Sequence, residues 1–137
     1  MVEQKIALGR TIYLDTDMEG ALEQIAGALK EEGFGILTEI DIKKTLKAKL
    51  DVDFRPYRIL GACNPALAYR ALSASSEVGL LLPCNVTMTE VNSNKIEISI
   101  IDPVALVDFT GNPALQSVAD EAKAKLGRVA DSLEENR

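Results

Sequence analysis

The sequence predicts an α+β fold, with a single antiparallel-rich sheet and helices on one face, in one domain that spans residues 1–137. Three observations support this prediction. Segments whose apolar residues repeat with the period of a strand or of a helix follow one another in the order β-α-β-α-β-α-β-β-α. A short polar turn joins the last two strands as a hairpin. No linker, internal repeat or low-complexity segment divides the chain, whose length suits one hydrophobic core.

The first half of the chain is expected to contain three strands separated by two helices. Residues 9–15 alternate as a strand does, and Thr16-Asp17-Met18-Glu19 is a capping box that predicts the start of a helix ending at Gly33. Residues 33–40 read as the second strand. Asp41 is expected to cap a short helix whose basic run we interpret as a solvated face. Residues 54–63 are the third strand. The lysines of the basic run are Lys43, Lys44, Lys47 and Lys49.

The second half is expected to contain a helix, a hairpin and a long terminal helix. Asn64-Pro65 predicts a helix start, because asparagine caps the first turn and proline suits its first position. Residues 78–91 are predicted as a long strand interrupted by Pro83, and the turn 92–94 leads to a strand over 95–102. Residues 103–111 are expected to form a loop. Asn112-Pro113 then opens a helix with a regular apolar stripe to Leu133.

Composition excludes several classes of function. Histidine and tryptophan are absent, so a histidine general base and histidine metal ligands are ruled out. Acidic residues outnumber basic ones 21 to 15 and no basic stripe is present, so we expect no nucleic-acid partner. No secretory leader or membrane-length apolar run is visible. We therefore expect a cytoplasmic protein without a membrane partner, in which the cysteines stay reduced.

Counting alternate positions along the strands predicts which side chains share a sheet face. In the third strand this places Tyr57, Ile59 and Cys63 on the face that helices cover. The opposite set, with Leu60 and Ala62, would then form an exposed apolar patch together with Leu81. Contiguous exposed apolar surface is typical of an interface, so we expect a homodimer formed partly through this patch. The alternative is that the loop 103–111 folds over it.

Cys63 and Cys84 are the two cysteines of the chain, and each belongs to a Cys-Asn pair. The preferred interpretation is that both are small buried hydrophobes of the core. The alternatives are a transient redox pair, a structural zinc site short of ligands, and a two-thiolate site for a soft ion such as Cu(I). No metal site and no cofactor can be assigned.

The residues near these pairs suit a small polar ligand, because asparagine amides both donate and accept hydrogen bonds. Asn64 and Asp102 also have structural explanations, as a helix cap and a turn residue. Asn85 has no comparable structural role and is the stronger candidate. Catalytic residues remain unknown. The predicted ligand-binding residues are Cys63, Asn64, Cys84, Asn85, Glu39 and Asp102.

Three segments in order carry a family resemblance: GFGILTEIDIKKTLKAKLDVDFRPYRILGACNPALAYRAL, GLLLPCNVTM and IDPVAL. They resemble the small bacterial and archaeal proteins grouped as domain of unknown function 302. The resemblance spans nearly the whole chain and places both Cys-Asn pairs in the family pattern. Ala66 departs from it, since relatives often carry a second proline there.

The resemblance implies a compact α+β fold of the TATA-box-binding-protein-like β-α-β4-α type and a dimer. It implies no catalytic residue, because the family has no established function. DNA binding does not follow from the fold, and the acidic charge opposes it.

The leading functional hypothesis is a non-enzymatic homodimer that binds a small ligand or soft metal near the two Cys-Asn pairs. The first alternative is a thiol-dependent redox protein or enzyme that uses Cys84. The second is a structural or interaction module.

Overall fold

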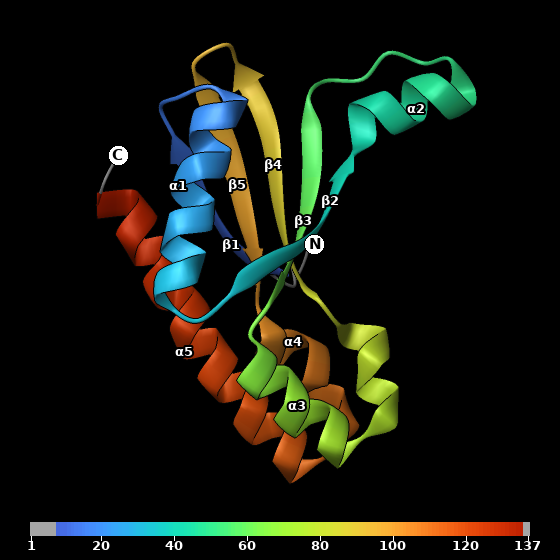
Figure 1. Cartoon of the computed structure of the whole chain (residues 1–137), viewed down its shortest axis with the longest axis vertical. Helices are drawn as coiled ribbons and strands as arrows, with labels where there is room; N and C mark the ends of the chain where they lie inside the picture. The colour runs from blue at the N-terminus through green and yellow to red at the C-terminus, as the bar shows by residue number, and fades with distance from the viewer. Residues whose placement is uncertain (1–7, 136–137) are drawn as a thin grey trace, which may run out of the picture.

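The computed structural model describes residues 8–135 and contains one five-stranded antiparallel sheet (Figure 1). The strand order across the sheet is β1-β5-β4-β3-β2, so β1 and β2 form its edges. This confirms the predicted α+β class. The ends of the predicted single domain, residues 1–7 and 136–137, lie outside the described residues. The strands are β1 (Gly9–Leu14), β2 (Gly35–Asp41), β3 (Tyr57–Cys63), β4 (Cys84–Asn92) and β5 (Lys95–Ile101).

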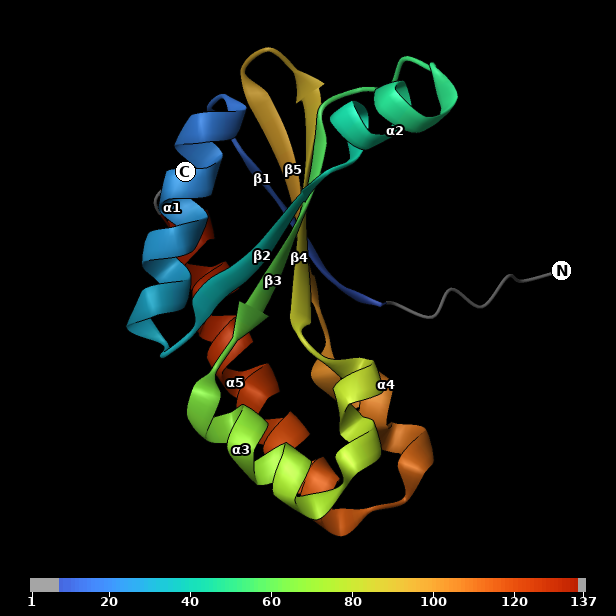
Figure 2. The ribbon, with the colours of Figure 1, turned by 45° about the vertical axis from the view of Figure 1, so that its right-hand side comes forward.

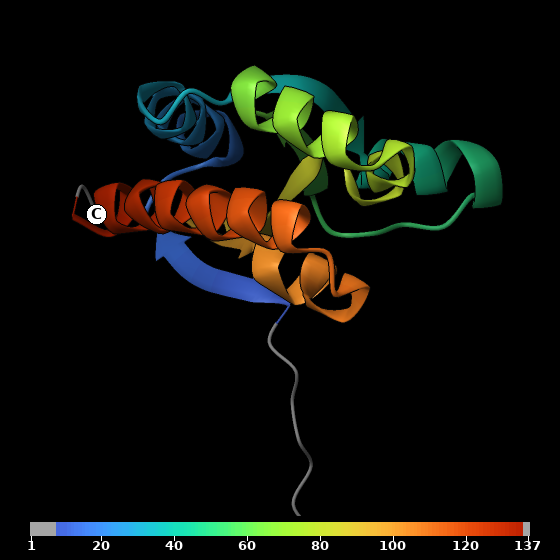
Figure 3. The same cartoon turned by 90° about the horizontal axis from the view of Figure 1, so that it is seen from below.

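Helices form a cover on one face of the sheet and a separate group beyond one end of it. Helix α1 and the C-terminal half of α5 pack on the sheet (Figure 1). The other helices, apart from α2, lie beyond the lower end of the sheet in Figure 1, beside the first half of α5 (Figure 3). The helices are α1 (Met18–Glu31), α2 (Ile42–Leu50), α3 (Pro65–Ala74), α4 (Pro103–Val107) and α5 (Pro113–Glu135), with 3-10 helices η1 (Ser76–Leu81) and η2 (Asp108–Thr110).

Helix α1 shows how the local sequence sets both ends of an element. Asp17, rather than the predicted Thr16, is the N-cap, and its carboxylate accepts a hydrogen bond from the backbone N–H of Gly20 at 2.8 Å. The helix ends at Glu31, and Gly33 terminates it in the left-handed conformation, as expected. Gly33 has φ of +83°, and backbone N–H groups of Gly33 and Phe34 bond to the carbonyls of Lys30 and Leu29. This is a Schellman motif, which requires a residue that tolerates the left-handed region.

Two predicted elements differ in the structure. Residues 76–81 form the 3-10 helix η1, and the strand predicted from residue 78 begins only at Cys84, after a cis Leu82–Pro83 bond. Residues 103–107, expected in a loop, form α4, whose N-cap is Asp102. Val78, Leu80 and Leu82 alternate as a strand would, but a 3-10 helix repeats every three residues, and Val78 is the buried residue of η1.

The predicted face assignment of β3 is wrong. Leu60 pairs with Val86 across the sheet and Ala62 pairs with Cys84, and residues directly opposite each other share a face. Leu60, Ala62 and Val86 are all buried under the helices. The expected apolar patch around Leu60 and Ala62 is therefore the core itself. The face left without a helix among the described residues carries Tyr57 and Ile59.

The apolar interior falls into two clusters, which α5 joins. The larger lies between the sheet and α1 and includes Ile25, Leu60, Met88 and Ile98. The smaller lies within the helical group and consists of Ala71, Val78, Val107, Leu115 and Ala119. Leu126 and Leu133 of α5 belong to the larger cluster and Leu115 to the smaller, so one helix spans both. None of the helices over residues 8–135 has both the length and the hydrophobicity to cross a bilayer.

Candidate functional site

An apolar cavity of about 60 Å³ lies where the lower end of the sheet meets the helical group. Both cysteines and Asn64 lie in its wall, and the other wall residues are almost all apolar. Side chains of α3, η1, α4 and α5 line it from several directions. The apolar wall includes Phe34, Ala62, Leu67, Ala71, Val78, Leu81, Leu82, Pro103, Leu106, Val107, Leu115, Val118, Ala119 and Ala122.

Strand ends bring the two cysteines to this cavity. Cys63 is the last residue of β3, and Cys84 is the first of β4, across from Ala62. Cys84 lies on the helix-covered face, as predicted. Cys63 belongs by alternation to the opposite set, contrary to the prediction, and reaches the cavity because its strand ends there. Both are half-buried free thiols.

Burial controls the chemistry of Cys84. Loss of solvent, with a smaller contribution from the nearby Cys63, raises the pKa of the Cys84 thiol to about 11. The thiolate is the form that attacks electrophiles and binds metals, and at neutral pH Cys84 holds its proton. Within residues 8–135, no group of three or more cysteine, aspartate or glutamate side chains is placed to hold a metal ion.

Asn64 has a complete structural role. Its side-chain oxygen accepts a hydrogen bond from the N–H of Leu67 at 3.2 Å and caps α3. Its amide nitrogen donates to the carbonyl oxygen of Glu32 at 3.2 Å, just beyond the C-terminal end of α1. Asn64 therefore ties α3 to the end of α1 at the rim of the cavity.

Two side chains pack closely on the backbone of Gly61, beside the cavity. A Cβ atom added to Gly61 would lie 2.2 Å from Thr38 Oγ1 and 2.7 Å from Pro83 Cγ. No side chain fits between those groups, so glycine at this position allows Thr38 and Pro83 to pack over β3. Pro83 directly precedes Cys84, and the close packing holds the start of β4 in place.

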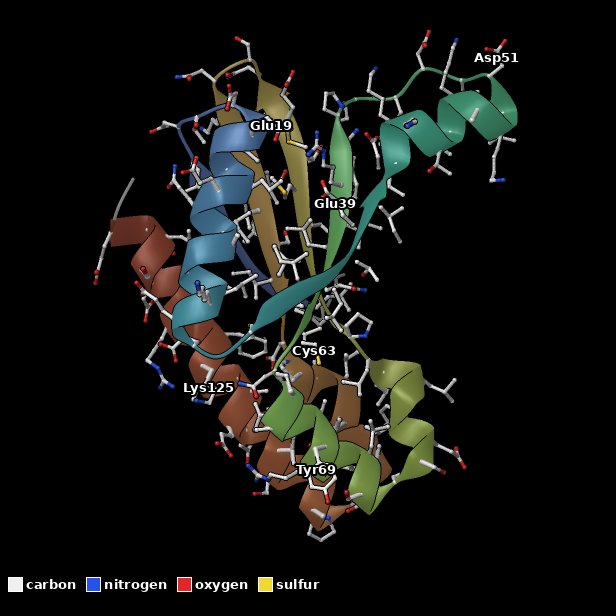
Figure 4. The ribbon with its side chains drawn as sticks, in the orientation of Figure 1. Glu19, Glu39, Asp51, Cys63, Tyr69 and Lys125 are labelled. Carbon is white, nitrogen blue, oxygen red and sulfur yellow. The ribbon has the colours of Figure 1, made fainter. Side chains whose placement is uncertain are left out.

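The other predicted site residues lie away from the cavity. Asn85 is exposed on the open sheet face, where it pairs with Gly61. Glu39 lies farther along β2 (Figure 4) and accepts a hydrogen bond from Arg58 at 3.0 Å, and Arg58 also contacts Glu19 of α1 at 2.9 Å.

Asp102 lies at the start of α4, outside the cavity wall. Its carboxylate accepts a hydrogen bond from the N–H of Val104 at 3.0 Å and forms an ion pair with Lys123 at 3.0 Å. The structure thus brings together Cys63, Asn64 and Cys84 but not Asn85, Glu39 or Asp102.

Much of the cavity wall comes from segments for which the sequence predicts other structures. Val78 of η1 and Leu106 and Val107 of α4 line the cavity, whereas the sequence predicts a strand and a loop there. One signal for α4 is visible in the sequence. Asp102-Pro103 has the same cap-then-proline order as Asn64-Pro65, and it does start a helix.

Comparison with known proteins places the chain in a family. Residues 10–133 match the family described as Domain of unknown function DUF302. The chain belongs to this family. A crystal structure of an uncharacterised conserved DUF302 protein from Bacillus stearothermophilus is 32% identical and superimposes with a TM-score of 0.82, covering 96% of this chain and 100% of that one. Among curated proteins, none matches the chain. Membership of the DUF302 family thus confirms the resemblance and assigns no activity.

Proposed function

We propose that this DUF302 protein is a non-enzymatic binding protein whose ligand places a small apolar group in the cavity between the sheet and the helical group. The supporting observation is the composition of the wall, which is apolar except for Asn64 and two thiols. Pockets that recognise small molecules are commonly apolar with a few polar groups at defined positions.

The cavity volume limits the group that enters. An apolar cavity of about 150 Å³ accommodates benzene, whereas this one measures about 60 Å³. A short alkyl group or a single heavy atom fits that space, and a larger ligand would extend past Asn64 at the rim. The wall favours an apolar occupant, in place of the polar ligand that the asparagines suggest from sequence.

The protonated Cys84 weighs against the two thiol alternatives, a soft-metal site and a redox enzyme. Both need a thiolate, and the pKa of about 11 keeps Cys84 protonated near neutral pH. Two free cysteines support the cytoplasmic location that is part of this proposal. The net charge of −6 supports the absence of a nucleic-acid partner.

Xenon tests the cavity proposal directly, because it enters dry apolar cavities. We expect saturable changes in the amide NMR signals of Leu67, Ala71 and Ala119 as xenon pressure rises. Ala119→Val adds two methyl groups to the cavity wall and should abolish those changes. The exposed Ala124→Val, on the same helix, is the matched control and should retain them. Absence of any saturable change in the wild type would contradict the proposal.

A second proposal concerns the open face of the sheet. We propose that a second copy of the chain covers it in a homodimer. Its central row of cross-strand neighbours consists of small polar and apolar side chains rather than charges, as suits packing between two sheets. This row is Thr11, Ser99, Thr87, Ile59 and Ile40. Sedimentation velocity at micromolar concentration should give a dimer, and a monomer would contradict it.

A further inference from the structure

Exposed helical elements lie at the two opposite ends of the open sheet face. Helix α2 projects beyond the face at one end, and η1 with η2 projects on the same side at the other (Figure 2). Both carry large apolar side chains in solvent. We call η1, η2 and their exposed side chains the lower rim.

Helix α2 is poorly supported by its own chain. It has nine residues, Ile42–Leu50, and none of them is buried. Isolated helices this short are marginal in water, and most helices gain their stability from packing an apolar face. Leu50 is 65% exposed and the adjacent Val52 is 44% exposed. The helix contacts β2 and β3, and its Ile42 and Leu46 are half-buried. Its last turn, with Leu50, stays largely exposed in the described chain.

The charge of α2 is opposite to that of the remainder of the protein. Residues 42–50 carry four lysines and no acidic residue, which leaves 11 basic and 21 acidic residues elsewhere and a net charge of −10 there. Lys43 donates to the carbonyl oxygen of Phe54 at 2.8 Å, and Lys47 pairs with Asp51 at 3.0 Å. Lys44 and Lys49 are exposed.

The lower rim has the complementary character. Leu80 of η1 is 84% exposed and Phe109 of η2 is 77% exposed, the two highest values among the large apolar residues of the described chain. Glu77 and Asp108 lie in the same two elements and are exposed. Acidic and apolar side chains therefore meet at one end of the open face, and basic and apolar side chains at the other.

We propose that α2 of each copy packs on the lower rim of the other copy, with Lys44 and Lys49 facing Glu77 and Asp108. The proposal rests on the homodimer proposed above and names its contacts. A two-fold axis that lies parallel to the sheet and across the strands brings the α2 end of one copy over the rim end of its partner. Because such an interface is isologous, the contact forms twice.

The same observations favour a second copy over a membrane as the partner of α2. A basic amphipathic helix can bind anionic lipid, but here the surrounding protein is acidic and would be repelled by the same surface. The complementary acidic and apolar surface lies on this chain, at the opposite end of the same open face (Figure 2).

Charge reversal on each side gives a test that depends on the contact being between chains. Lys44→Glu/Lys49→Glu and Glu77→Lys/Asp108→Lys should each weaken the homodimer at least tenfold in sedimentation equilibrium, since both contacts become repulsive. An equimolar mixture of the two variants should form a heterodimer. In it, one contact is native and the other is fully reversed, so both are attractive again.

The outcomes separate this inference from the proposed dimer. Lys30→Glu/Lys125→Glu makes the same charge change as Lys44→Glu/Lys49→Glu, but on the helices that cover the other face of the sheet. This control should dimerise as the wild type does. Circular dichroism checks that every variant folds. If the wild type is a dimer and neither reversal weakens it, the α2 contact is wrong and the sheet interface stands. Weakening without heterodimer formation would also overturn the contact. A monomeric wild type would overturn both proposals.

Discussion

At the scale of single residues, Cys84 shows how burial decides chemistry. Its thiol has a pKa of about 11, raised by loss of solvent, while the same thiol in the unfolded chain ionises near its ordinary value. Between these two values the folded state holds a proton that the unfolded state has lost. The contribution of Cys84 to folding stability is therefore fully present below the ordinary thiol pKa. It is lost as the pH rises toward the folded-state pKa.

This difference predicts a measurable pH dependence. The wild type should lose on the order of 2 kcal/mol more stability than Cys84→Ala between about pH 8 and pH 11. Urea unfolding across that range measures the difference, and the comparison removes the contributions of tyrosines and lysines that both proteins share. The Cys84 thiol should also react slowly with a thiol reagent at neutral pH. Rapid, stoichiometric reaction of Cys84 in the folded protein would revive the redox alternative.

Gly61 gives a second prediction at this scale. A methyl group there would meet Thr38 Oγ1 at 2.2 Å and Pro83 Cγ at 2.7 Å, so Gly61→Ala should destabilise the fold by about 1–3 kcal/mol through overpacking. The matched control is Gly35→Ala in the neighbouring strand, because no described atom lies within 4 Å of its added Cβ. Urea midpoints measure both. Equal effects of the two substitutions would show that Gly61 is not constrained by packing.

At the scale of elements, Asn64 combines a helix cap with a link between helices. Asn64→Ala should cost about 1–2 kcal/mol, because the cap of α3 is lost and the Glu32 carbonyl loses its donor. Asn64→Ser keeps a capping oxygen and lacks the amide donor, so it should cost less. Thermal unfolding of the two variants separates the contributions. If Asn64→Ser costs as much as Asn64→Ala, the link to Glu32 carries the stability and the cap does not.

Elements that begin with a capping side chain could be predicted from sequence, because the signal is local. Asn64, Asp41 and Asn112 each start the helix expected of them. The 3-10 helix η1 could not be predicted, since its apolar spacing also fits a strand and Gly79 offers no distinctive boundary. The missed α4 carried a cap and a proline, but five residues give too short a hydrophobic pattern to recognise.

The candidate site could be predicted only in part for a different reason. Cys63, Asn64 and Cys84 converge because β3 and β4 are antiparallel neighbours, whereas the sequence predicts only the hairpin of β4 with β5. The face of β3 depends on its register with β4, and alternation alone leaves two choices. The cavity wall comes from α3, η1, α4 and α5 together. Its composition is a tertiary property that no single segment contains.

At the scale of the whole molecule, α5 joins the sheet core to the helical group that encloses the cavity. Its Leu126 and Leu133 pack in the first cluster and Leu115 packs in the second. Leu115→Ala should destabilise the helical group by about 2–4 kcal/mol. We expect hydrogen exchange to rise first in α3 and α4, while the sheet keeps more of its protection. Uniform loss of protection across the sheet and the helical group would show that the two clusters unfold as one unit.

If the open face of the sheet is the dimer interface, a charge placed on it should prevent assembly of the chain. Thr87 lies at the centre of that face, between Ile59 and Ser99. Thr87→Arg would bury one guanidinium group from each copy in the dimer interface, so it should produce a monomer in sedimentation velocity. Gln24→Arg on the exposed side of α1 adds the same charge away from the face and should remain dimeric. The melting temperature of the wild type should rise with protein concentration, because association stabilises the folded state, while that of Thr87→Arg should not. A wild type whose melting temperature is independent of concentration, and a Thr87→Arg variant of unchanged mass, would together exclude this face as the dimer interface.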